Sequence, residues 1–386
     1  MTGPDGRVRV LMLVDSLLPG GAERFLIGLA THLPPERYEV CVCATRGQPD
    51  PLVDVVREAG LRYEVLGRRG RFDLSPFRRL RRLLRDGEFD VLHAHKFGSN
   101  LWGSIVGRLA RTPVVIAHEQ TWSYEGQPLR RFLDGRVIAR LADVFVAVSS
   151  RDRERMTSVE RIPPEKTVYI PNAFVPRVGE RAAAGLRDQL GIEPDAPVVG
   201  TMCVLRRQKR LDVLIDAFAL VAEDHPDARL VIAGYGPLDE AWKARAAERG
   251  LSERVHWLGK RDDPEAVLAT VDVAAMSSDF EGTPLFAFEC MSARTPVVTT
   301  DVGGLRDVFE AGTSALLVPR RDPRALAVAI GELLSDPDRR RAMAAAAYAR
   351  LDEFTIERAV ERVGDLYESL LERRGVALPR AAAPAR

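Results

Sequence analysis

The stretch "DVAAMSSDFEGTPLFAFECMSARTPVVTTD", residues 272–301, decides the fold class. Its first six residues (272–277) and its last six (296–301) are short apolar or β-branched runs, which is typical of buried strands. The apolar segment between them is long enough for a helix. Alternation of strands and helices is the pattern of a parallel sheet covered by helices, so this stretch predicts an α/β fold.

The same alternation continues along all 386 residues. It falls into two series, separated by residues 172–197, which carry prolines and charges and leave room for one short helix. The strands expected in the first series are residues 8–14, 39–44, 63–66, 90–95, 113–118, 144–149 and 167–171. Those expected in the second are residues 198–205, 229–234, 254–259, 272–277, 296–301 and 315–319. Each series predicts a doubly wound, Rossmann-like sheet.

The length of the chain exceeds one typical core and suits two domains. We place an N-terminal domain at residues 1–175 and a C-terminal domain at residues 176–354. Helical spacing predicts a last helix over residues 355–374, which we expect to pack back on the N-terminal domain. Doubly wound sheets bind ligands at the carboxyl ends of their strands, so we expect the two domains to face a deep interdomain cleft.

The composition argues against nucleic-acid-binding, membrane-spanning and secreted proteins. The formal net charge of +1 does not predict a nucleic-acid partner. No apolar run approaches the roughly 18 residues of a spanning helix, and the amino terminus lacks a signal-peptide core, which predicts a cytoplasmic protein. The four cysteines are irregularly spaced. Cys41 and Cys43 alternate with valines, which predicts one buried face of a strand rather than a metal site.

Two carboxylates flank the start of the helix expected inside the opening stretch. Thr283 is predicted as its N-cap and Pro284 as its first residue. Glu281 then lies on the preceding loop, and Glu289 lies in the second helical turn. Because the rest of this helix is nearly all apolar, an ionised Glu289 needs a hydrogen-bonding partner in the protein or in a ligand.

The start of this helix is also a candidate anion site. Backbone N–H groups of Gly282, Thr283 and Leu285 are expected to face a phosphate or a pyrophosphate. Glu289 could then accept hydrogen bonds from the diol of a ribose. The residues alone leave a second interpretation open, in which Glu281 caps the helix and Glu289 pairs with an arginine inside the protein.

Candidate residues of the N-terminal half also follow strands. Gly20 and Gly21 lie between the first expected strand and the first helix, where the backbone can approach a ligand closely. This loop is neither a P-loop nor a GxGxxG fingerprint, which disfavours a dehydrogenase. His118 ends one strand, and His93 and His95 end the preceding one. Without a nearby carboxylate cluster, these histidines do not favour a metal site.

The stretch "RRGRFDLSPFRRLRRLLRDG", residues 68–87, predicts a basic amphipathic helix. Ser75 and Pro76 begin it. One face of helix 76–86 is apolar, and five arginines spread over the rest. Two interpretations stay open: an ordinary solvated face, or a peripheral contact with an anionic membrane or a phospholipid acceptor.

An ordered series of motifs resembles the retaining family-4 glycosyltransferases of the GT-B fold. The likeness is carried by the Glu-x7-Glu region in residues 277–330, and upstream by "VIAGYGPLDE", "VHWLGKRDD" and "TMCVLRRQKRLDVLIDAF". It covers essentially all of residues 197–350. In the N-terminal half it is weaker and rests on "PGGAER", "DVLHAH", "PVVIAHE", "VAVSS" and "IPNAF".

The resemblance implies transfer of a sugar from a nucleotide diphosphate donor to an acceptor with retention of anomeric configuration. The acceptor would be a glycan, a lipid or a small molecule. Family members use a front-face route, which implies neither a metal nor another cofactor. A sugar-nucleotide epimerase or a non-catalytic sugar-nucleotide-binding protein of the same fold is the alternative.

The resemblance also assigns roles to individual residues. Glu289 matches the glutamate that binds the donor ribose, and Glu281 matches the glutamate near the hydroxyls of the donor sugar. Lys209 matches the lysine that neutralises the pyrophosphate, and His118 matches the histidine near the donor sugar. Glu281, His118 and Lys209 are therefore the implied catalytic residues. The loop with Gly20 and Gly21 becomes part of the cleft floor.

The chain departs from the family pattern at one position near the phosphates. The family usually has an arginine five residues before the lysine, where this chain has Val204. Arg206 and Arg207, in the following turn, are the candidates to replace it. Two smaller departures are Arg294, where the family usually has glycine, and Asp307, where it usually has glutamate. The implied donor-binding set is Lys209, Arg206, Arg207, Gly282, Thr283, Pro284, Leu285, Glu289, Gly20 and Gly21.

Overall fold

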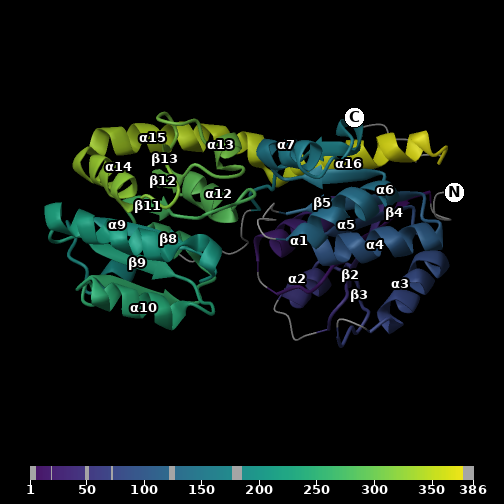
Figure 1. Ribbon diagram of the computed structural model, residues 1–386, viewed down its shortest axis with the longest axis horizontal. Helices are drawn as coiled ribbons and strands as arrows, with labels where there is room; N and C mark the ends of the chain where they lie inside the picture. Colours follow the sequence, from purple (N-terminus) through teal and green to yellow (C-terminus); the bar gives the residue numbers. More distant parts are fainter. Residues whose placement is uncertain are drawn as a thin grey trace. The chain divides into compact units, whose positions relative to one another are not determined.

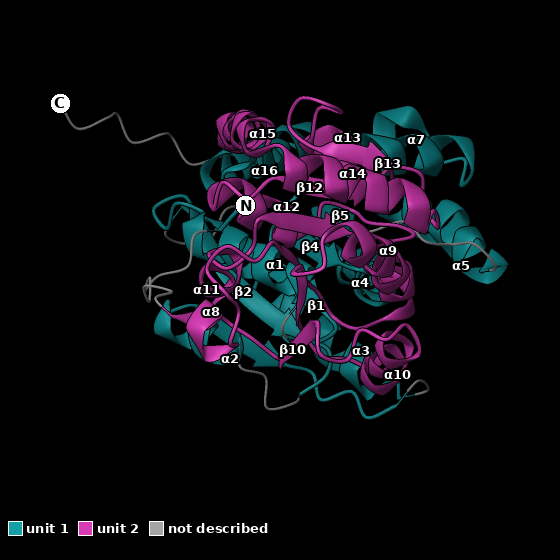
Figure 2. Cartoon of the chain, turned by 90° about the vertical axis from the view of Figure 1, so that its left-hand side faces the viewer, with its two compact units in different colours: residues 1–175, 354–386 teal, residues 176–353 magenta. Residues whose placement is uncertain are grey.

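The computed structural model describes residues 6–18, 20–47, 52–70, 73–120, 127–175 and 185–376. The chain forms two compact units: residues 1–175 with 354–386, and residues 176–353, which Figure 2 draws in different colours. Each unit is built on one parallel sheet covered by helices (Figure 1). The α/β class and the two doubly wound sheets expected from the sequence are confirmed.

The sheet of unit 1 has seven parallel strands in the order β3-β2-β1-β4-β5-β6-β7. Its strands are β1 Val8–Val14, β2 Tyr38–Ala44, β3 Arg62–Val65, β4 Val91–His95, β5 Val114–Glu119, β6 Val144–Ala147 and β7 Thr167–Tyr169. The order reverses between β1 and β4, which lie side by side in the middle of the sheet. This is the switch point at which such sheets bind ligands.

Helices cover both faces of this sheet. One face packs against α1 Gly21–His32, α2 Leu52–Glu58 and the C-terminal α16 Ile356–Arg373. The other face packs against α3 Ser75–Asp86 and α4 Phe97–Ala110, with a third cluster around residues 138–162. The remaining helical segments are α5 Pro128–Leu133, the π-helical turn η1 Asp134–Ile138, α6 Ala139–Leu141, α7 Ser150–Ser158 and η2 Pro164–Lys166.

The sheet of unit 2 has six parallel strands in the order β10-β9-β8-β11-β12-β13. Its strands are β8 Val198–Met202, β9 Arg229–Ala233, β10 Val255–Gly259, β11 Val273–Met276, β12 Val297–Thr300 and β13 Leu316–Val318. Its helical segments are α8 Leu186–Gln189, η3 Arg207–Lys209, α9 Leu211–Asp224, α10 Asp239–Glu248, α11 Pro264–Leu268, α12 Leu285–Ser292, α13 Leu305–Val308, α14 Pro323–Ser335 and α15 Pro337–Arg350. The turn η4 Leu351–Phe354 leads into α16. In this unit the strand order reverses between β8 and β11.

Strand β2 shows why these runs form buried strands. Cys41 and Cys43 lie in the cluster on the α3 side, whereas Val40 and Val42 lie in the cluster on the α1 side. A parallel strand covered on both faces needs apolar side chains in both directions, and that makes the run continuous rather than alternating. Both thiols are buried, as predicted, and neither forms a disulfide.

Strand β8 is shorter than predicted. It ends at Met202, three residues before the expected end. The backbone continues as a loop beside the end of β9, where the N–H of Leu205 donates to the carbonyl of Tyr235 at 2.9 Å. This loop carries Val204, and it leads into the turn η3.

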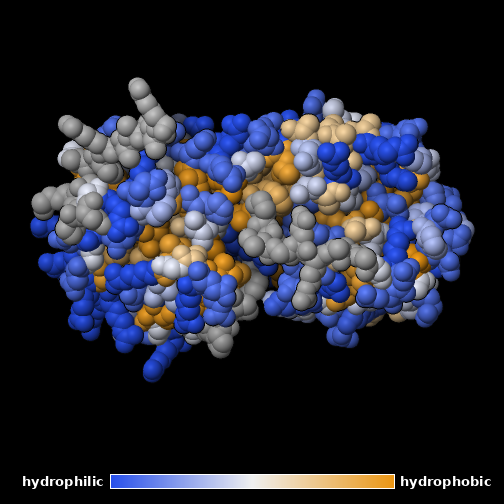
Figure 3. Space-filling model, turned by 180° about the vertical axis from the view of Figure 1, so that it is seen from behind, coloured by the Kyte–Doolittle hydropathy of each residue, from blue (hydrophilic) through white to orange (hydrophobic). Residues whose placement is uncertain are grey.

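Two further features bear on function. Among the described residues, no helix combines the length and the apolar character needed to cross a bilayer. On the face drawn in Figure 3, hydrophilic residues cover most of both units, with smaller apolar patches between them.

Candidate active site

Lys209 and Glu281 meet at the switch point of the sheet in unit 2. Lys209 ends the turn that follows β8, and Glu281 lies on the loop that follows β11. The Nζ atom of Lys209 lies 2.5 Å from Oε1 of Glu281. Because β8 and β11 are neighbours whose carboxyl ends point the same way, two residues 72 positions apart in the sequence form one ion pair.

The backbone around this pair is fixed by several hydrogen bonds. The Ser277 hydroxyl donates to the carbonyl of Lys209 at 2.8 Å, and the N–H of Asp279 donates to the carbonyl of Gln208 at 2.8 Å. Arg210 has a left-handed backbone, with φ of 49°, and its guanidinium pairs with Asp279 at 3.3 Å. The loops after β8 and β11 are therefore tied together, which positions both members of the ion pair.

The electrostatics of the pair favour a charged lysine. Burial by itself would lower the pKa of Lys209, but the nearby Glu281 carboxylate outweighs burial and holds that pKa above its ordinary value. The side chain of Glu281 is 7% exposed and that of Lys209 is 21% exposed. Ser278 also donates a hydrogen bond of 2.5 Å to Glu281 Oε1. The site thus holds a fixed positive charge next to a buried carboxylate.

Gly303 supports the loop of Glu281 from the other side. Its backbone is left-handed, with φ of 50°, and a Cβ atom there would overlap the carbonyl oxygen of Glu281. The N–H of Gly304 donates to the carbonyl of Gly282 at 3.0 Å. Only glycine allows both the backbone conformation and this close approach.

A pocket with about 270 Å³ of empty space opens at this edge of unit 2. Its lining residues are Thr201, Met202, Cys203, Lys209, Leu211, Met276, Ser277, Ser278, Glu281, Pro284 and Phe286. Part of this space is open to solvent, and the charged side chains of Lys209 and Glu281 lie among its mostly uncharged lining residues.

The start of helix α12 differs from the prediction. Pro284, in extended conformation, takes the N-cap position, and the first helical residue is Leu285. No side chain caps this end, so the prediction that Thr283 is the N-cap was wrong. Thr283 is instead buried, at 3% exposure. A fixed φ of −71° lets proline end the loop without a capping side chain.

Glu289 is not the buried carboxylate that the apolar surroundings suggested. It lies in the second turn of α12, as predicted, but its side chain is partly exposed. It does not line the pocket beside Glu281.

The predicted phosphate-binding arginines also lie outside this pocket. Arg206 and Arg207 are exposed at the start of the turn that ends with Lys209, and Val204 is partly buried. Arg294 follows α12 with a left-handed φ of 52°, a conformation that favours glycine. Its guanidinium carbon lies 4.2 Å from the ring centroid of Tyr348, which offsets part of the backbone strain.

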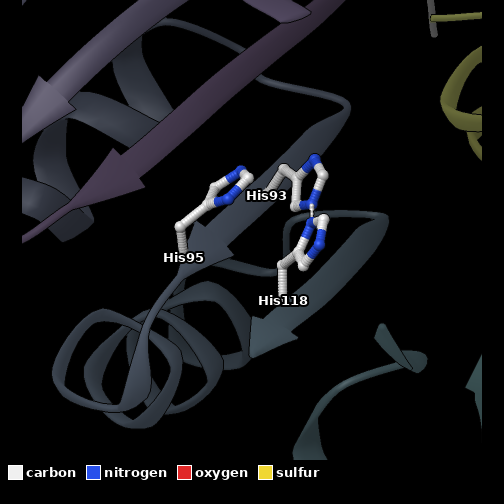
Figure 4. A group of neighbouring side chains, drawn as sticks. All are labelled: His93, His95 and His118. Carbon is white, nitrogen blue, oxygen red and sulfur yellow. Dashed lines mark hydrogen bonds between the residues drawn. The ribbon is translucent and has the colours of Figure 1, made fainter. Parts of the chain in front are cut away.

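Three histidines form a buried cluster in unit 1 (Figure 4). His93 and His95 come from β4 and His118 comes from β5, and all three side chains are fully buried. His93 Nε2 lies 3.1 Å from His118 Nδ1, and His93 Nδ1 lies 2.6 Å from the hydroxyl of Tyr367 on α16. His118 lies one residue before the end of β5 and is fully buried.

The distances in this cluster are compatible with a chain of hydrogen bonds that starts at Tyr367. Burial raises the pKa of the Tyr367 phenol, so its hydroxyl keeps a proton, which it can donate to His93 Nδ1. His93 then carries its proton on Nε2 and donates to His118 Nδ1. This leaves an N–H at His118 Nε2, which has no hydrogen-bond partner among the described residues.

The histidines are neutral, because burial lowers the pKa of all three, that of His93 to about 3. Their ligand atoms lie within 4.8 Å of one another, which is compatible with a metal site in distance alone. In the tautomers described above, however, both nitrogens of His93 are used in hydrogen bonds. In those tautomers, Tyr367 and His93 together orient the ring of His118.

A second lysine–glutamate pair lies at the switch point of unit 1. Gly20 is the N-cap of α1 and Gly21 is its first residue, as the loop was expected to place them; Pro19 of the same motif lies outside the described residues. Glu23, in the first turn of α1, pairs with Lys96 after β4 at 2.6 Å. Glu23 is 4% exposed. A lysine–glutamate ion pair therefore lies close to the glycine loop at this edge of unit 1.

Several residues of these sites could not be identified from the sequence. Tyr367 is an ordinary core position of an amphipathic helix, and nothing in its spacing shows that it contacts β4. Gly303 had a usable signal, because a pair of glycines directly after a predicted strand indicates a close backbone approach. Ser278 and Glu23 carried no signal beyond their position after strands.

Comparison with known proteins places both units in described families. The family described as "Glycosyl transferases group 1" matches residues 184–350. The family described as "Glycosyltransferase Family 4" matches residues 19–176. Together the two matches cover the strands of both sheets except β1.

Two curated relatives align with most of this chain. The D-inositol 3-phosphate glycosyltransferase of Corynebacterium urealyticum is 33% identical over 311 residues, which cover 73% of this chain and 72% of that protein. The D-inositol 3-phosphate glycosyltransferase of Thermobispora bispora is 27% identical over 390 residues, covering 92% of this chain and 91% of that protein.

Solved structures show the same fold. The Anabaena protein HepE in complex with UDP-glucose has a TM-score of 0.84 at 22% identity, covering 94% of this chain and 100% of that chain. The sucrose-phosphate synthase of Thermosynechococcus elongatus has a TM-score of 0.78 at 21% identity, covering 95% of this chain and 100% of that chain.

Proposed function

Because this chain belongs to the family-4-like glycosyltransferases of the GT-B fold and is therefore an enzyme that uses a nucleotide-sugar donor, we propose that it transfers the sugar with retention of anomeric configuration. The observation that carries the proposal is the Lys209–Glu281 pair at the switch point of unit 2. Glycosyl transfer needs a fixed positive charge where the leaving diphosphate develops negative charge.

Lys209 supplies that charge. An ammonium has three donors, and the Glu281 carboxylate accepts one of them. The remaining donors are available to the pyrophosphate, which we place beside the loop of Gly282 and Thr283 and the helix start at Pro284 and Leu285. The partial positive charge of the α12 N-terminus adds to the attraction.

The other donor contacts follow from the same placement. Glu281 accepts hydrogen bonds from hydroxyls of the donor sugar, and Glu289, which water can reach, accepts them from the ribose. Arg206 and Arg207 are exposed next to Lys209, and we propose that they take over the phosphate contact that Val204 cannot make. In this assignment Glu281 binds the donor sugar and Glu289 binds the ribose.

In unit 1 we assign His118 to the donor sugar and the loop of Gly20 and Gly21 to the acceptor side. The relay from Tyr367 through His93 leaves an N–H on His118 Nε2, which can donate to a sugar hydroxyl. Because His118 is fully buried, this contact requires a local rearrangement at the end of β5.

The proposed reaction breaks the bond between the anomeric carbon and the phosphate oxygen, and forms a bond from that carbon to the acceptor oxygen on the same face. The proton of the acceptor hydroxyl passes to the departing phosphate. No protein nucleophile is needed, and Lys209 balances the charge of the leaving group without a metal ion. The acceptor is a glycan, a lipid-linked sugar or a small molecule.

A thermal-shift screen with UDP-, GDP- and ADP-sugars tests the donor site. One of these donors is expected to raise the melting temperature of the wild type, and Glu289→Ala is expected to weaken that donor by about tenfold or more, since it removes a charge-assisted hydrogen bond. Unchanged donor binding by Glu289→Ala would contradict the ribose assignment.

Product analysis tests the reaction. Transfer to an acceptor with the donor's anomeric configuration, observed by NMR and unchanged by a chelator, supports the proposal. Isomerisation of the donor without an acceptor would point to an epimerase, and donor binding without turnover would point to a binding protein.

A further inference from the structure

On one face of the sheet in unit 1, α4 contacts α3 and the turn η1, and η1 continues α5 (Figure 1). The rings of Phe77 on α3 and Trp102 on α4 stack with centroids 3.7 Å apart. Arg130 on α5 lies over the ring of Phe97 on α4, at 4.6 Å from its centroid. These contacts join the three helices into one surface, and Figure 2 shows α5 projecting on this side of unit 1.

The surface is strongly basic. The five arginines of α3 are exposed, and none of them forms an ion pair within the described part of the chain. Four more arginines are exposed and have no ion pair in this part of the chain. They are Arg111 directly after α4, Arg131 on α5, and Arg136 and Arg140 in the segments that follow α5. The arginines of α3 are Arg78, Arg79, Arg81, Arg82 and Arg85. Unpaired cations on one face, in a chain with a net charge of only +1, indicate an anionic partner.

Large apolar side chains are exposed among these arginines. Leu74 at the start of α3 is 57% exposed, and Leu109 at the end of α4 is 60% exposed. Leu129 and Phe132 on α5 are 63% and 59% exposed, and α5 has no buried residue at all. Exposed apolar side chains gain no binding free energy from the phosphates of a nucleic acid, but they insert favourably among the acyl chains of lipids.

We propose that this basic face, formed by the exposed side chains of residues 74–85, 109–111 and 129–140, docks on an anionic lipid bilayer. The arginines contact lipid phosphates, and the four apolar side chains enter the boundary between head groups and acyl chains. The inference rests on the proposed function in one respect, since it selects a lipid-linked acceptor from the three classes named there. Docking itself does not depend on catalysis.

The expected strength follows from the charges. Each basic residue near an anionic surface contributes about fivefold to membrane partitioning. Removing two of them is therefore expected to lower partitioning by about 25-fold. The attraction weakens with salt, because exposed charges are screened over about 10 Å at moderate ionic strength.

Vesicle flotation of the full chain tests the proposal. Vesicles of phosphatidylcholine alone are compared with equimolar phosphatidylcholine and phosphatidylglycerol. The wild type is expected to bind only the anionic vesicles, and Arg78→Ala/Arg82→Ala is expected to bind them about 25-fold more weakly. The matched control is Arg324→Ala/Arg362→Ala, which removes two exposed arginines of α14 and α16 that have no ion pair with another described residue, and it is expected to bind like the wild type.

A second variant tests the apolar component. Leu129→Ser/Phe132→Ser is expected to lose the part of the binding that survives raised salt. Because all these residues are exposed, circular dichroism should show unchanged folding. Donor hydrolysis without vesicles reports the proposed function separately and is expected to stay at the wild-type level in Arg78→Ala/Arg82→Ala.

Equal binding of the wild type to neutral and anionic vesicles, or equal loss in both arginine double variants, would overturn the proposal. Tighter binding to a duplex RNA than to anionic vesicles would also overturn it and would identify a nucleic acid as the partner. Absence of donor hydrolysis with intact vesicle binding would instead contradict the proposed function alone.

Discussion

Glu281→Gln is expected to destabilise unit 2 by leaving Lys209 without its counter-ion. Glutamine has nearly the same shape and can still accept the hydrogen bond from Ser278, so packing should change little. The main change is electrostatic. The Nζ of Lys209 now lies 2.5 Å from a carboxylate, and in the variant it would face a neutral amide.

The magnitude follows from burial. Removing one partner of a buried ion pair costs about 3–5 kcal/mol, because the other charge stays buried and unpaired. Lys209 keeps 21% of its side chain exposed, so water compensates part of this, and we expect about 2–3 kcal/mol. Lys209→Met should cost more, about 3–4 kcal/mol, since Glu281 is only 7% exposed.

The assay is urea unfolding at several pH values, with hydrogen exchange of peptides from β11 and α12 to assign the transition to unit 2. In the wild type the pKa of Lys209 lies above its ordinary value of 10.5, so its stabilising effect is complete below pH 10.5 and is lost as the pH rises through the raised pKa. In Glu281→Gln, burial acts alone and lowers that pKa. The difference between variant and wild type should therefore shrink in alkaline solution.

Glu240→Gln is the control. Glu240 pairs with Lys243 at 3.1 Å, but its side chain is 89% exposed, so solvent screens the pair and its loss should leave the stability almost unchanged. The reasoning fails if Glu281→Gln costs no more than this control, or if its cost does not change with pH.

Tyr367→Phe is expected to cost about 1–2 kcal/mol in urea unfolding, because His93 Nδ1 loses its donor while it stays buried. It should also lower kcat, and long-range NMR correlations should show a changed proton position in the histidine cluster. Gly303→Ala is expected to cost about 3 kcal/mol or more by calorimetry, since its Cβ would overlap the Glu281 carbonyl. Gly312→Ala, with φ of 81° and no neighbour within 4 Å, should cost only about 1–2 kcal/mol and so isolates the backbone effect. Burial lowers the pKa of His93 from 6.5 to about 3, so the unfolded chain binds that proton more readily, and stability should be lost as the pH falls from 6.5 towards 3. Unfolding midpoints measured across this range should show the loss, and His93→Gln should reduce it.

The strands of both sheets lie where the apolar runs predicted them. This succeeded because a parallel strand covered on both faces must be apolar along most of its length, as β1 shows from Val10 to Val14. Errors occurred at strand ends, for example at β8, because the end of a strand depends on which neighbour offers the next hydrogen bond. The sequence pattern does not show which segment of the chain that neighbour is.

The candidate site was predictable in part. Lys209 and Glu281 could be selected because each follows a strand and matches a family position, and the structure brings them together. The N-cap prediction at Thr283 failed, since Pro284 took that position. Exposure was also unpredictable: Glu289 on an apolar helix is partly exposed, and His118 at a strand end is fully buried.

The amino-acid sequence by itself determined the alternation of strands and helices, the division into two sheets and the residues that carry charge after each strand. These features are local, because they depend on hydrophobic period, turn residues and spacing. Only the tertiary structure decided which of those residues meet. The reversal of strand order between β8 and β11 places the loops of Lys209 and Glu281 side by side, and α16 returns to unit 1 to bring Tyr367 to His93. Such contacts join residues far apart in the chain, and they exist only because long-range packing buries polar groups that must then find partners.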